Sequence, residues 1–329
     1  TVYGRGFRFV GDVILESVAP PEPEPPRPKA SGPSVAVLPF ADLSPERDQG
    51  YFCDGIAEEL INTLTRLEEL RVVSRNVAFD FRNDEDVRTL GGTLGVDHIL
   101  RGSVRKAEER LRISVHLVDV NSGHHVWSER YDRTVGDVFM LQEEIAENTA
   151  RVLLGVLSDR NRKAMKSTPV RLDAYEFYLK GRTYQALHTV AALQSAIGMF
   201  EIAIEFDTRY APAYAGLADV LADLYTETHE RDLLRRADAA SLRAVELAPD
   251  LAEAHVCRGS ALAAAEKYDD ASIEFELALS INPRSLDAHL RYAAVLLAEG
   301  NRDEARKMLA AAAEMQPQDR RASERLAAI

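Results

Sequence analysis

The chain has 329 residues, of which 46% are hydrophobic and 28% are charged, and its formal net charge is −13. At about 100 to 200 residues per domain, this length predicts two or three domains, each large enough to bury its own core. No apolar run approaches the roughly 18 residues that cross a bilayer, so we expect no membrane anchor and a cytoplasmic location. Residues 173–329 hold 17 Lys and Arg against 26 Asp and Glu, which makes that half a poor candidate for binding nucleic-acid phosphates.

The cysteines are typical of a reducing compartment. Cys53 and Cys257 are the only two in the sequence, and they lack the spacing of a metal site or of a disulfide framework. We expect two small buried side chains. The first residue is Thr1, with no charged and then apolar leader after it, so we expect no signal peptide and a chain that begins inside a longer gene product.

Residues 1–13 alternate apolar and polar side chains around a Gly-Arg-Gly turn, which predicts a β-hairpin. Two strands alone are marginally stable in water, so we expect this hairpin to pack on residues upstream of it. The segment resembles the C-terminal wing of OmpR-type and CadC-type winged-helix DNA-binding domains. The residues that carry the resemblance are Val2, Gly4, Gly6, Phe7 and Phe9.

This resemblance implies how the hairpin meets DNA. In the family, one helix enters the major groove while the wing lies along the backbone and the minor groove. The implied contacts are Arg5, at the tip, to the minor groove or a phosphate, and Arg8 to the backbone. The alternative is that both arginines are solvated charges of a hairpin.

Residues 14–33 are predicted to be a linker. Seven of the 14 prolines lie in residues 19–33, and such a segment behaves as an extended, semi-stiff spacer. In membrane-integrated relatives of the CadC type, a transmembrane helix occupies this interval. Its absence favours a wholly cytoplasmic regulator.

Residues 34–157 are predicted to form an α/β domain. The apolar run Ser34–Phe40 is typical of a buried strand, and we expect Asp54 to cap a helix that ends at Leu67. Further elements are expected as strands at 70–74, 98–104, 111–120 and 125–131, a helix at 86–94, a charged turn at 105–110 and a closing helix from Val138 to Val156. The strand at 111–120 alternates apolar and polar residues, which predicts one solvated face.

Four phrases of this region resemble the TolB-like amino-terminal domain over about residues 33–155. They are PSVAVLPFADLS, YFCDGIAEELINTL, LGVDHILRGSVRK and HHVWSERYDR. The resemblance implies a mixed-sheet α/β fold and a non-enzymatic module of the kind found between DNA-binding, cyclase or kinase domains and repeats. It supplies no ligand.

The sequence carries no recognisable catalytic motif. It has no Gly-x-Ser-x-Gly elbow, no Walker phosphate loop and no His-Glu-x-x-His helix. His124 and His125 are neighbours on an expected strand, so their side chains point to opposite faces and cannot readily share a metal. Glu58 and Glu59 are interpreted as neighbours on a solvated helix start. We therefore predict no catalytic residues, no metal, no cofactor and no enzyme.

The clearest internal signal is a repeat. Pro249, Pro283 and Pro317 follow one another at intervals of 34 residues, which is the length of the tetratricopeptide (TPR) repeat. Small and apolar residues recur at equivalent offsets, where neighbouring helices must pack closely. Residues 173–329 are therefore predicted to be an all-α TPR solenoid of four units, with a capping helix that begins near Ala322.

The array resembles TPR proteins whose concave face binds an extended peptide or a partner domain. Helix phase then indicates five candidate peptide-binding residues on the first helices of the units: His255, Arg258, His289, Arg291 and Tyr292. The alternative for each residue is a solvated surface role. The alternative for the whole array is to stabilise the α/β domain.

Together these features predict a non-enzymatic bacterial one-component transcriptional regulator. It would bind DNA through a winged helix and a protein partner through its repeats, with no membrane partner. Two alternatives remain open: a TPR scaffold or assembly protein, and the non-catalytic region of a signalling cyclase or kinase.

Overall fold

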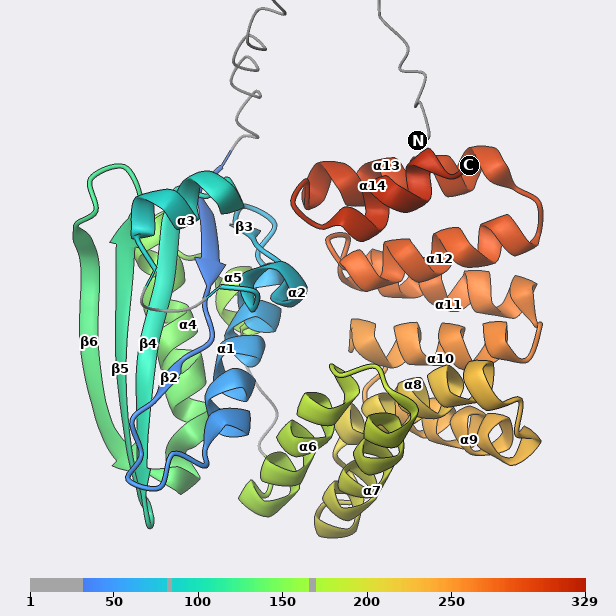
Figure 1. The fold of residues 1–329 in the computed structure, drawn as a ribbon, viewed down its shortest axis with the longest axis horizontal. Helices are drawn as coiled ribbons and strands as arrows, with labels where there is room; N and C mark the ends of the chain where they lie inside the picture. Colours follow the sequence, from blue (N-terminus) through green and yellow to red (C-terminus); the bar gives the residue numbers. More distant parts are fainter. Residues whose placement is uncertain (1–31, 82–84, 166–169) are drawn as a thin grey trace, which may run out of the picture. The chain divides into compact units, whose positions relative to one another are not determined.

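The computed structural model describes residues 32–81, 85–165 and 170–329. The predicted hairpin and most of the predicted linker lie outside the described residues, as do Arg5 and Arg8. Residues Gly32–Ile329 form one compact unit, in which a mixed sheet with helices on its faces is followed by stacked helix pairs (Figure 1). The predicted combination of an α/β region and helical repeats is confirmed.

The sheet has the order β3-β1-β4-β5-β6, with β2 pairing beside β4. Its strands are β1 (Ser34–Val37), β2 (Ala41–Asp42), β3 (Arg71–Val72), β4 (His98–Ala107), β5 (Arg110–Asp119) and β6 (His125–Thr134). β1 runs parallel to β3 and β4, and β4, β5 and β6 form an antiparallel meander. The two edges of the sheet are therefore the short β3 and the long β6.

Helices cover both faces of the central strand β1. The helices of this region are α1 (Gly50–Thr65), α2 (Arg75–Ala78), α3 (Val87–Leu94), the 3-10 helix η1 (Val135–Asp137), α4 (Val138–Leu154) and α5 (Asp159–Ala164). Because side chains alternate along a strand, Val35 and Val37 face one side and Ala36 and Leu38 the other. The first pair packs with residues of α1 and α4, and the second pair packs with residues of α3. A strand buried on both faces explains the apolar run of the sequence.

Two local predictions are wrong. Helix α1 begins at Gly50 with Gln49 as its N-cap, so Asp54 lies inside the helix. Its start is set by Asp42, whose carboxylate accepts a hydrogen bond from the Gln49 backbone N–H at 2.8 Å. The charged turn predicted at 105–110 is only Glu108 and Glu109 long, because the residues on either side pair in the β4–β5 ladder.

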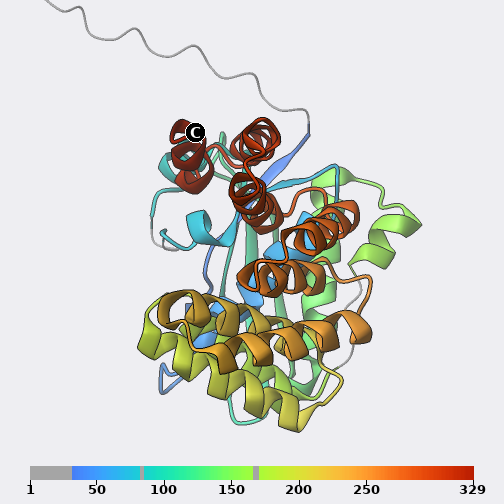
Figure 2. The ribbon, with the colours of Figure 1, turned by 90° about the vertical axis from the view of Figure 1, so that its right-hand side faces the viewer.

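The second half consists of antiparallel helix pairs that stack on one another (Figure 2). They are α6 (Leu172–Gln185) with α7 (Val190–Phe206), α8 (Ala211–Thr228) with α9 (Arg231–Leu247), α10 (Ala252–Ala264) with α11 (Tyr268–Ile281), α12 (Leu286–Ala298) with α13 (Arg302–Met315), and the last helix α14 (Arg320–Ala327). The helices α10, α12 and α14 start at residues 252, 286 and 320, so they keep the 34-residue period.

Glycines allow helices to approach closely both within a pair and between neighbouring pairs. The Phe200 ring of α7 lies between Gly181 of α6 and Gly216 of α8, and a Cβ at either glycine would come within 2.6 Å of the ring. Gly259 of α10 is in the same situation with Phe275, where the distance would be 2.8 Å. The expectation that small residues recur for close packing is confirmed.

The hydrophobic core of the α/β region continues into the first repeats. One cluster of buried residues joins the sheet and α1 to residues of α6 through α10, and a second cluster spans α10 to α14. Tyr175 of α6 is 1% exposed, and its hydroxyl oxygen accepts a hydrogen bond from Gln142 Nε2 of α4 at 2.6 Å. Both cysteines are buried, as expected. The α/β region and the first repeats therefore share one core.

Candidate functional site

The most elaborate polar structure lies where α1, α2 and β3 contact the repeats, and we call this contact the junction. At its centre is Glu58 of α1, which is 4% exposed. Arg182 of α6 donates from Nε to Glu58 Oε1 at 2.9 Å and also from Nη2 to the same oxygen, while Arg75 Nε lies 2.9 Å from Glu58 Oε2. One carboxylate thus joins three helices.

The electrostatics of the junction separate two adjacent carboxyl groups. Burial by itself raises the pKa of Glu58, but the charges of Arg182 and Arg75 outweigh it, so the pKa is lowered and the carboxylate stays ionised. Burial and the charge of Glu58 raise the pKa of Glu59 to about 7. The interpretation of Glu58 and Glu59 as a solvated helix start is wrong, because this part of α1 packs against α6.

A second part of the junction covers the β3 edge of the sheet. The Gln316 side chain donates from Nε2 to Val72 O at 2.7 Å, and its Oε1 accepts from the Ser74 backbone N–H at 3.1 Å. A single amide side chain thereby satisfies a donor and an acceptor of the edge, as a neighbouring strand would. Arg284 adds a hydrogen bond from Nη1 to Leu70 O.

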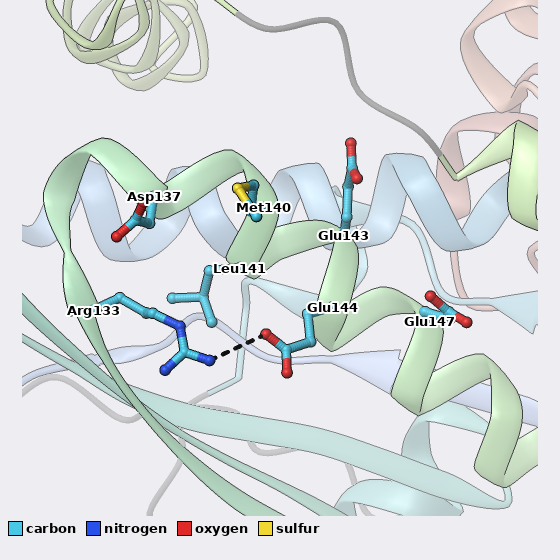
Figure 3. A pocket seen from close by; sticks show the side chains of 7 residues that line it. All are labelled: Arg133, Asp137, Met140, Leu141, Glu143, Glu144 and Glu147. Carbon is cyan, nitrogen blue, oxygen red and sulfur yellow. Dashed lines mark ion pairs between the residues drawn. The ribbon is translucent and has the colours of Figure 1, made fainter.

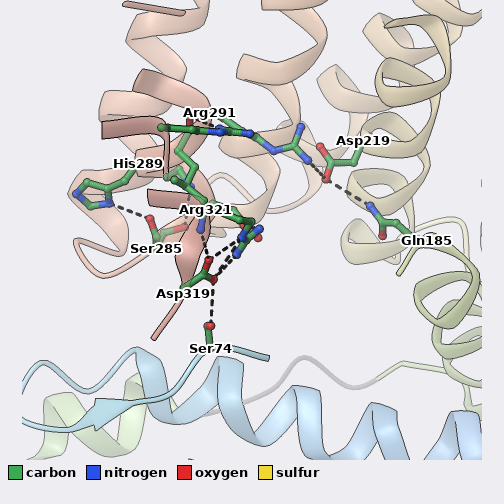
Figure 4. Close-up of polar contacts among 12 residues, drawn as sticks. Ser74, Gln185, Asp219, Ser285, His289, Arg291, Asp319 and Arg321 are labelled. Carbon is green, nitrogen blue, oxygen red and sulfur yellow. Dashed lines mark hydrogen bonds and ion pairs between the residues drawn. The ribbon is translucent and has the colours of Figure 1, made fainter. Parts of the chain in front are cut away.

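Asp319, just before α14, extends this contact. Its carboxylate accepts from Ser74 Oγ at 3.5 Å and pairs with Arg321 Nη2 at 2.8 Å (Figure 4). The Asp319 side chain is 3% exposed. Burial alone would raise the pKa of its carboxyl, but hydrogen bonds and charge from Arg321 lower it, so Asp319 remains an anion at neutral pH.

A row of polar side chains crosses the first helices of successive repeats. Arg291 of α12 donates to Asp219 Oδ2 of α8 at 3.0 Å and to Ser260 Oγ of α10 at 3.0 Å, and Gln185 of α6 donates to the same Asp219 oxygen at 3.5 Å (Figure 4). Asp223 Oδ1 lies 3.6 Å from Arg291 Nη1. Burial raises the pKa of Asp219 to about 6 although Arg291 opposes the shift. We call these residues the helix-A row.

The structure brings only Arg291, of the five candidate peptide-binding residues, into this row. His255 is 6% exposed, with Nδ1 2.7 Å from Glu274 Oε2 and Nε2 2.9 Å from Pro249 O. Arg258 pairs with Asp238 of α9 at 2.6 Å.

The other two candidates are also engaged within the repeats. His289 is 7% exposed and its Nδ1 lies 2.9 Å from the backbone oxygen of Ser285, the N-cap of its own helix. Tyr292 is 7% exposed; it donates its hydroxyl hydrogen to Glu276 Oε1 at 2.9 Å, and its ring stacks on Phe275. The five residues do not form one surface, and their role in peptide binding stays a prediction.

Two open clefts lie near the end of β6. The first has a volume of about 480 Å³ and is lined by Arg133, Asp137, Met140, Leu141, Glu143, Glu144 and Glu147 (Figure 3). The second has a volume of about 820 Å³, and its lining includes four arginines and two aspartates. The linings contain no serine, cysteine, histidine or lysine, and the groups in them that could act as nucleophile or base are the Thr134 hydroxyl and the carboxylates.

Within the described ranges, no group of three or more His, Cys, Asp or Glu side chains is arranged to hold a metal ion. Among the helices of the same residues, none combines the length and apolar character needed to cross a membrane.

The residues of the junction cannot be recognised from the sequence alone, because their partners are remote in sequence. Glu58 and Arg182 are 124 positions apart. One signal was present: Gly55 lies in mid-helix, where a glycine is unfavourable unless something packs closely. A Cβ at Gly55 would come within 2.4 Å of the Leu179 side chain of α6. That glycine marks a second packed face of α1, on which Glu58 lies one turn later.

Known proteins are similar to the α/β region and to the helical repeats separately. Residues 31–148 match the family described as "HilA/YgeH-like transcriptional regulator, second domain". Residues 262–329 match the tetratricopeptide repeat family, which confirms the TPR prediction for that part of the chain.

Two curated proteins are similar to this chain in sequence. The "Putative adenylate cyclase 3" of Rhizobium meliloti (strain 1021) is 37% identical over 201 residues, which are 59% of this chain and 34% of that protein. The transcriptional regulator HilA of Salmonella typhimurium is 21% identical over 311 residues, 93% of this chain and 53% of that protein. The chain thus spans about a third and about half of these two proteins.

Among solved structures, a thermophilic TPR protein of Thermus thermophilus aligns with a TM-score of 0.43 and 21% identity. The alignment covers 59% of this chain and 89% of that protein.

Proposed function

We propose that this chain is the non-enzymatic signal-receiving region of a bacterial one-component transcriptional regulator. The observation that carries the proposal is the match of residues 31–148 to the second domain of HilA/YgeH-like transcriptional regulators, in a chain whose residues 262–329 match the TPR family. The similarity to HilA over 93% of the chain supports the same order of domains. The finer assignment of residues 34–157 to the TolB-like group is part of this proposal.

The mechanism is positional and needs no covalent chemistry. The α/β region and the first repeats share a core, so they act as one body. The last repeats contact that body through Gln316, Arg284 and Asp319. Single polar contacts of this kind contribute about 0.5–1.5 kcal/mol each. A partner that binds the repeats can therefore change the junction without unfolding either part, and a DNA-binding domain tethered at the N-terminus would report that change.

The helix-A row is the proposed contact for that partner. It presents a cation, Arg291, between carboxylates of α8 and a hydroxyl of α10. A peptide that carries a carboxylate could replace Asp219 as the partner of Arg291, since the raised pKa of Asp219 makes its charge costly near neutral pH.

DNA binding is proposed to use Arg5 and Arg8 of the wing. The test is the affinity of the full-length natural protein for its own promoter DNA, measured by fluorescence anisotropy at several salt concentrations. Arg5→Ala is expected to weaken binding and reduce the salt dependence by about one phosphate contact. Arg27→Ala, in the proline-rich segment, also removes one positive charge and should leave the DNA affinity and its salt dependence unchanged. Equal affinities of the wild type, the Arg5 variant and the Arg27 variant would refute the assignment of residues 1–13 as a DNA-binding wing.

A second candidate function has its own observation. The 37% identity to the putative adenylate cyclase favours the non-catalytic region of a signalling enzyme, and the TPR match is also compatible with a scaffold. An assay of cyclic AMP formation from ATP by the full-length natural protein separates the candidates. Formation of cyclic AMP supports the signalling enzyme. Salt-dependent promoter binding without cyclic AMP supports the regulator, and the absence of both leaves the scaffold.

A further inference from the structure

The two edges of the sheet are treated differently. The edge at β3 is two residues long, and Gln316 of the repeats occupies its backbone groups. The edge at β6 is ten residues long (Figure 1). In the part of the chain that the structure describes, no strand pairs with the outer side of β6. An uncovered strand of this length is a template for pairing with another strand.

The hydrogen-bonding direction of β6 follows from its ladder with β5. Val135 N–H donates to Glu109 O at 2.9 Å, so Val135 directs its backbone groups toward β5. Tyr131 lies opposite Ile113 of β5 and is an even number of residues from Val135, so it has the same orientation. In an antiparallel pair, alternate residues direct N–H and C=O to the same neighbour. The odd-numbered residues from 127 to 135 therefore bond to β5. The even-numbered residues 128, 130, 132 and 134 direct their backbone groups outward.

The order of charges along β6 makes the strand complementary to itself. The sequence from Glu129 to Arg133 is Glu-Arg-Tyr-Asp-Arg. A second copy of this strand that runs antiparallel, with Tyr131 on the twofold axis, places Arg130 opposite Asp132 and Glu129 opposite Arg133. Because the axis generates each contact twice, four pairs of opposite charge line the contact.

This register also satisfies the backbone. It sets even-numbered residues opposite even-numbered residues, so the outward N–H and C=O groups meet their counterparts. The two neighbouring registers that do the same put Arg130 opposite Arg130 or Asp132 opposite Asp132. Both create like-charge pairs, which are unfavourable directly across a ladder. Charges on an edge strand usually keep other chains away, but this order selects one partner and one register.

The four charged side chains involved are exposed, and one of them, Glu129, accepts a hydrogen bond from the Tyr131 hydroxyl at 3.0 Å. Arg130 and Asp132 are 67% and 52% exposed, and they lie 3.6 Å apart within the strand. Arg133 is 45% exposed and lies 3.6 Å from Glu144 of α4 (Figure 3). Asp132 also pairs with Arg112 of β5 at 2.5 Å. Exposed ion pairs of this kind contribute little to stability, so the groups can take new partners at small cost.

We propose that the chain forms a twofold-symmetric homodimer through antiparallel pairing of β6 with β6 of a second copy, centred on Tyr131. The two sheets then become one continuous sheet, and each β6 edge is covered by the β6 strand of the other copy. The proposal does not depend on the function proposed above.

The test uses sedimentation velocity of the 329-residue chain from about 1 to 100 μM, a range in which mass action reveals a weak dimer. The wild type is expected to form a dimer. Arg130→Asp places two carboxylates opposite each other twice in the interface, and Asp132→Arg does the same with two guanidinium groups. Each variant should raise the dimer dissociation constant roughly tenfold or more. Arg160→Asp, at a side chain of α5 that is 80% exposed, is the matched control and should leave it unchanged.

Two further samples separate pairing from misfolding. The double variant Arg130→Asp with Asp132→Arg restores opposite charges across the axis and should dimerise again. An equimolar mixture of the two single variants should form a heterodimer, because each supplies the charge that the other lacks. A wild type that stays monomeric over the range overturns the proposal. So does a dimer that Arg130→Asp leaves intact, or a double variant that remains monomeric while its circular dichroism matches the wild type.

Discussion

Replacing Glu58 by glutamine removes the negative charge that lies between Arg182 and Arg75 while it keeps the size of the side chain. The carboxylate is 4% exposed, whereas the two arginine side chains are 32% and 21% exposed. Removing one partner of a fully buried ion pair costs about 3–5 kcal/mol. Since both guanidinium groups retain some contact with solvent, we expect a loss of about 2–3 kcal/mol in the free energy of unfolding.

The assay is urea unfolding followed by far-UV circular dichroism, and the control is Glu68→Gln. Glu68 pairs with Arg160 at 2.6 Å, but these side chains are 56% and 80% exposed. The control should therefore change the free energy of unfolding by less than about 0.5 kcal/mol. If Glu58→Gln costs no more than Glu68→Gln, the junction is not held by a buried charge.

A double-mutant cycle assigns the effect to the correct contact. Arg182→Met keeps the apolar stem of the side chain and removes its charge. We expect the double variant with Glu58→Gln to lose less free energy of unfolding than the two single variants lose together. The difference should be at least about 1 kcal/mol, because each single variant already breaks the same pair. Additive losses would show that the two side chains stabilise the chain independently.

Three further predictions concern the repeats and the junction. Gly216→Val should lower the free energy of unfolding, measured in thermal melts, by about 1–3 kcal/mol more than Gly198→Val does. The reason is that a Cβ at Gly216 meets the Phe200 ring, while a Cβ at Gly198 has nothing within 4 Å. Equal losses would contradict the close packing at Gly216. Gln316→Ala should speed hydrogen exchange of the Ser74 amide about tenfold, since that N–H loses its acceptor, and unchanged exchange would show that Gln316 does not hold the edge. Glu59 keeps a proton in the folded state up to about pH 7, whereas an ordinary glutamate releases it near 4.5. The free energy of unfolding of the wild type should therefore fall by about 1–3 kcal/mol as pH rises through that window. Urea titrations at several pH values should show a smaller fall for Glu59→Gln. Parallel profiles of the two proteins would refute the raised pKa of Glu59.

The sequence predicted those parts of the fold that depend on local pattern. The run from Val35 to Leu38 identified a central strand because both of its faces are apolar. The period of 34 residues identified the repeats because each unit must bury the same positions against its neighbour. Both signals lie within one element or recur from unit to unit, so they can be recognised without knowledge of the tertiary structure.

The junction could not be predicted in this way. The role of Glu58 depends on Arg182 and Arg75, which belong to other helices, and a glutamate near a helix start is normally solvated. Gln316 lies 244 positions from Val72, and nothing local distinguishes it from other polar residues between helices. The helix start was misplaced for a related reason, because Asp42 of the preceding strand β2 fixes it.

Occupancy of the chromosome shows whether the chain belongs to a DNA-binding regulator. The measurement is chromatin immunoprecipitation with sequencing of the full-length natural protein, in the wild-type form and with Arg5→Ala. We expect discrete enriched sites upstream of genes for the wild type and a marked loss of enrichment at those sites for the variant. A wild-type profile without enriched sites would show that the protein is not a DNA-binding regulator.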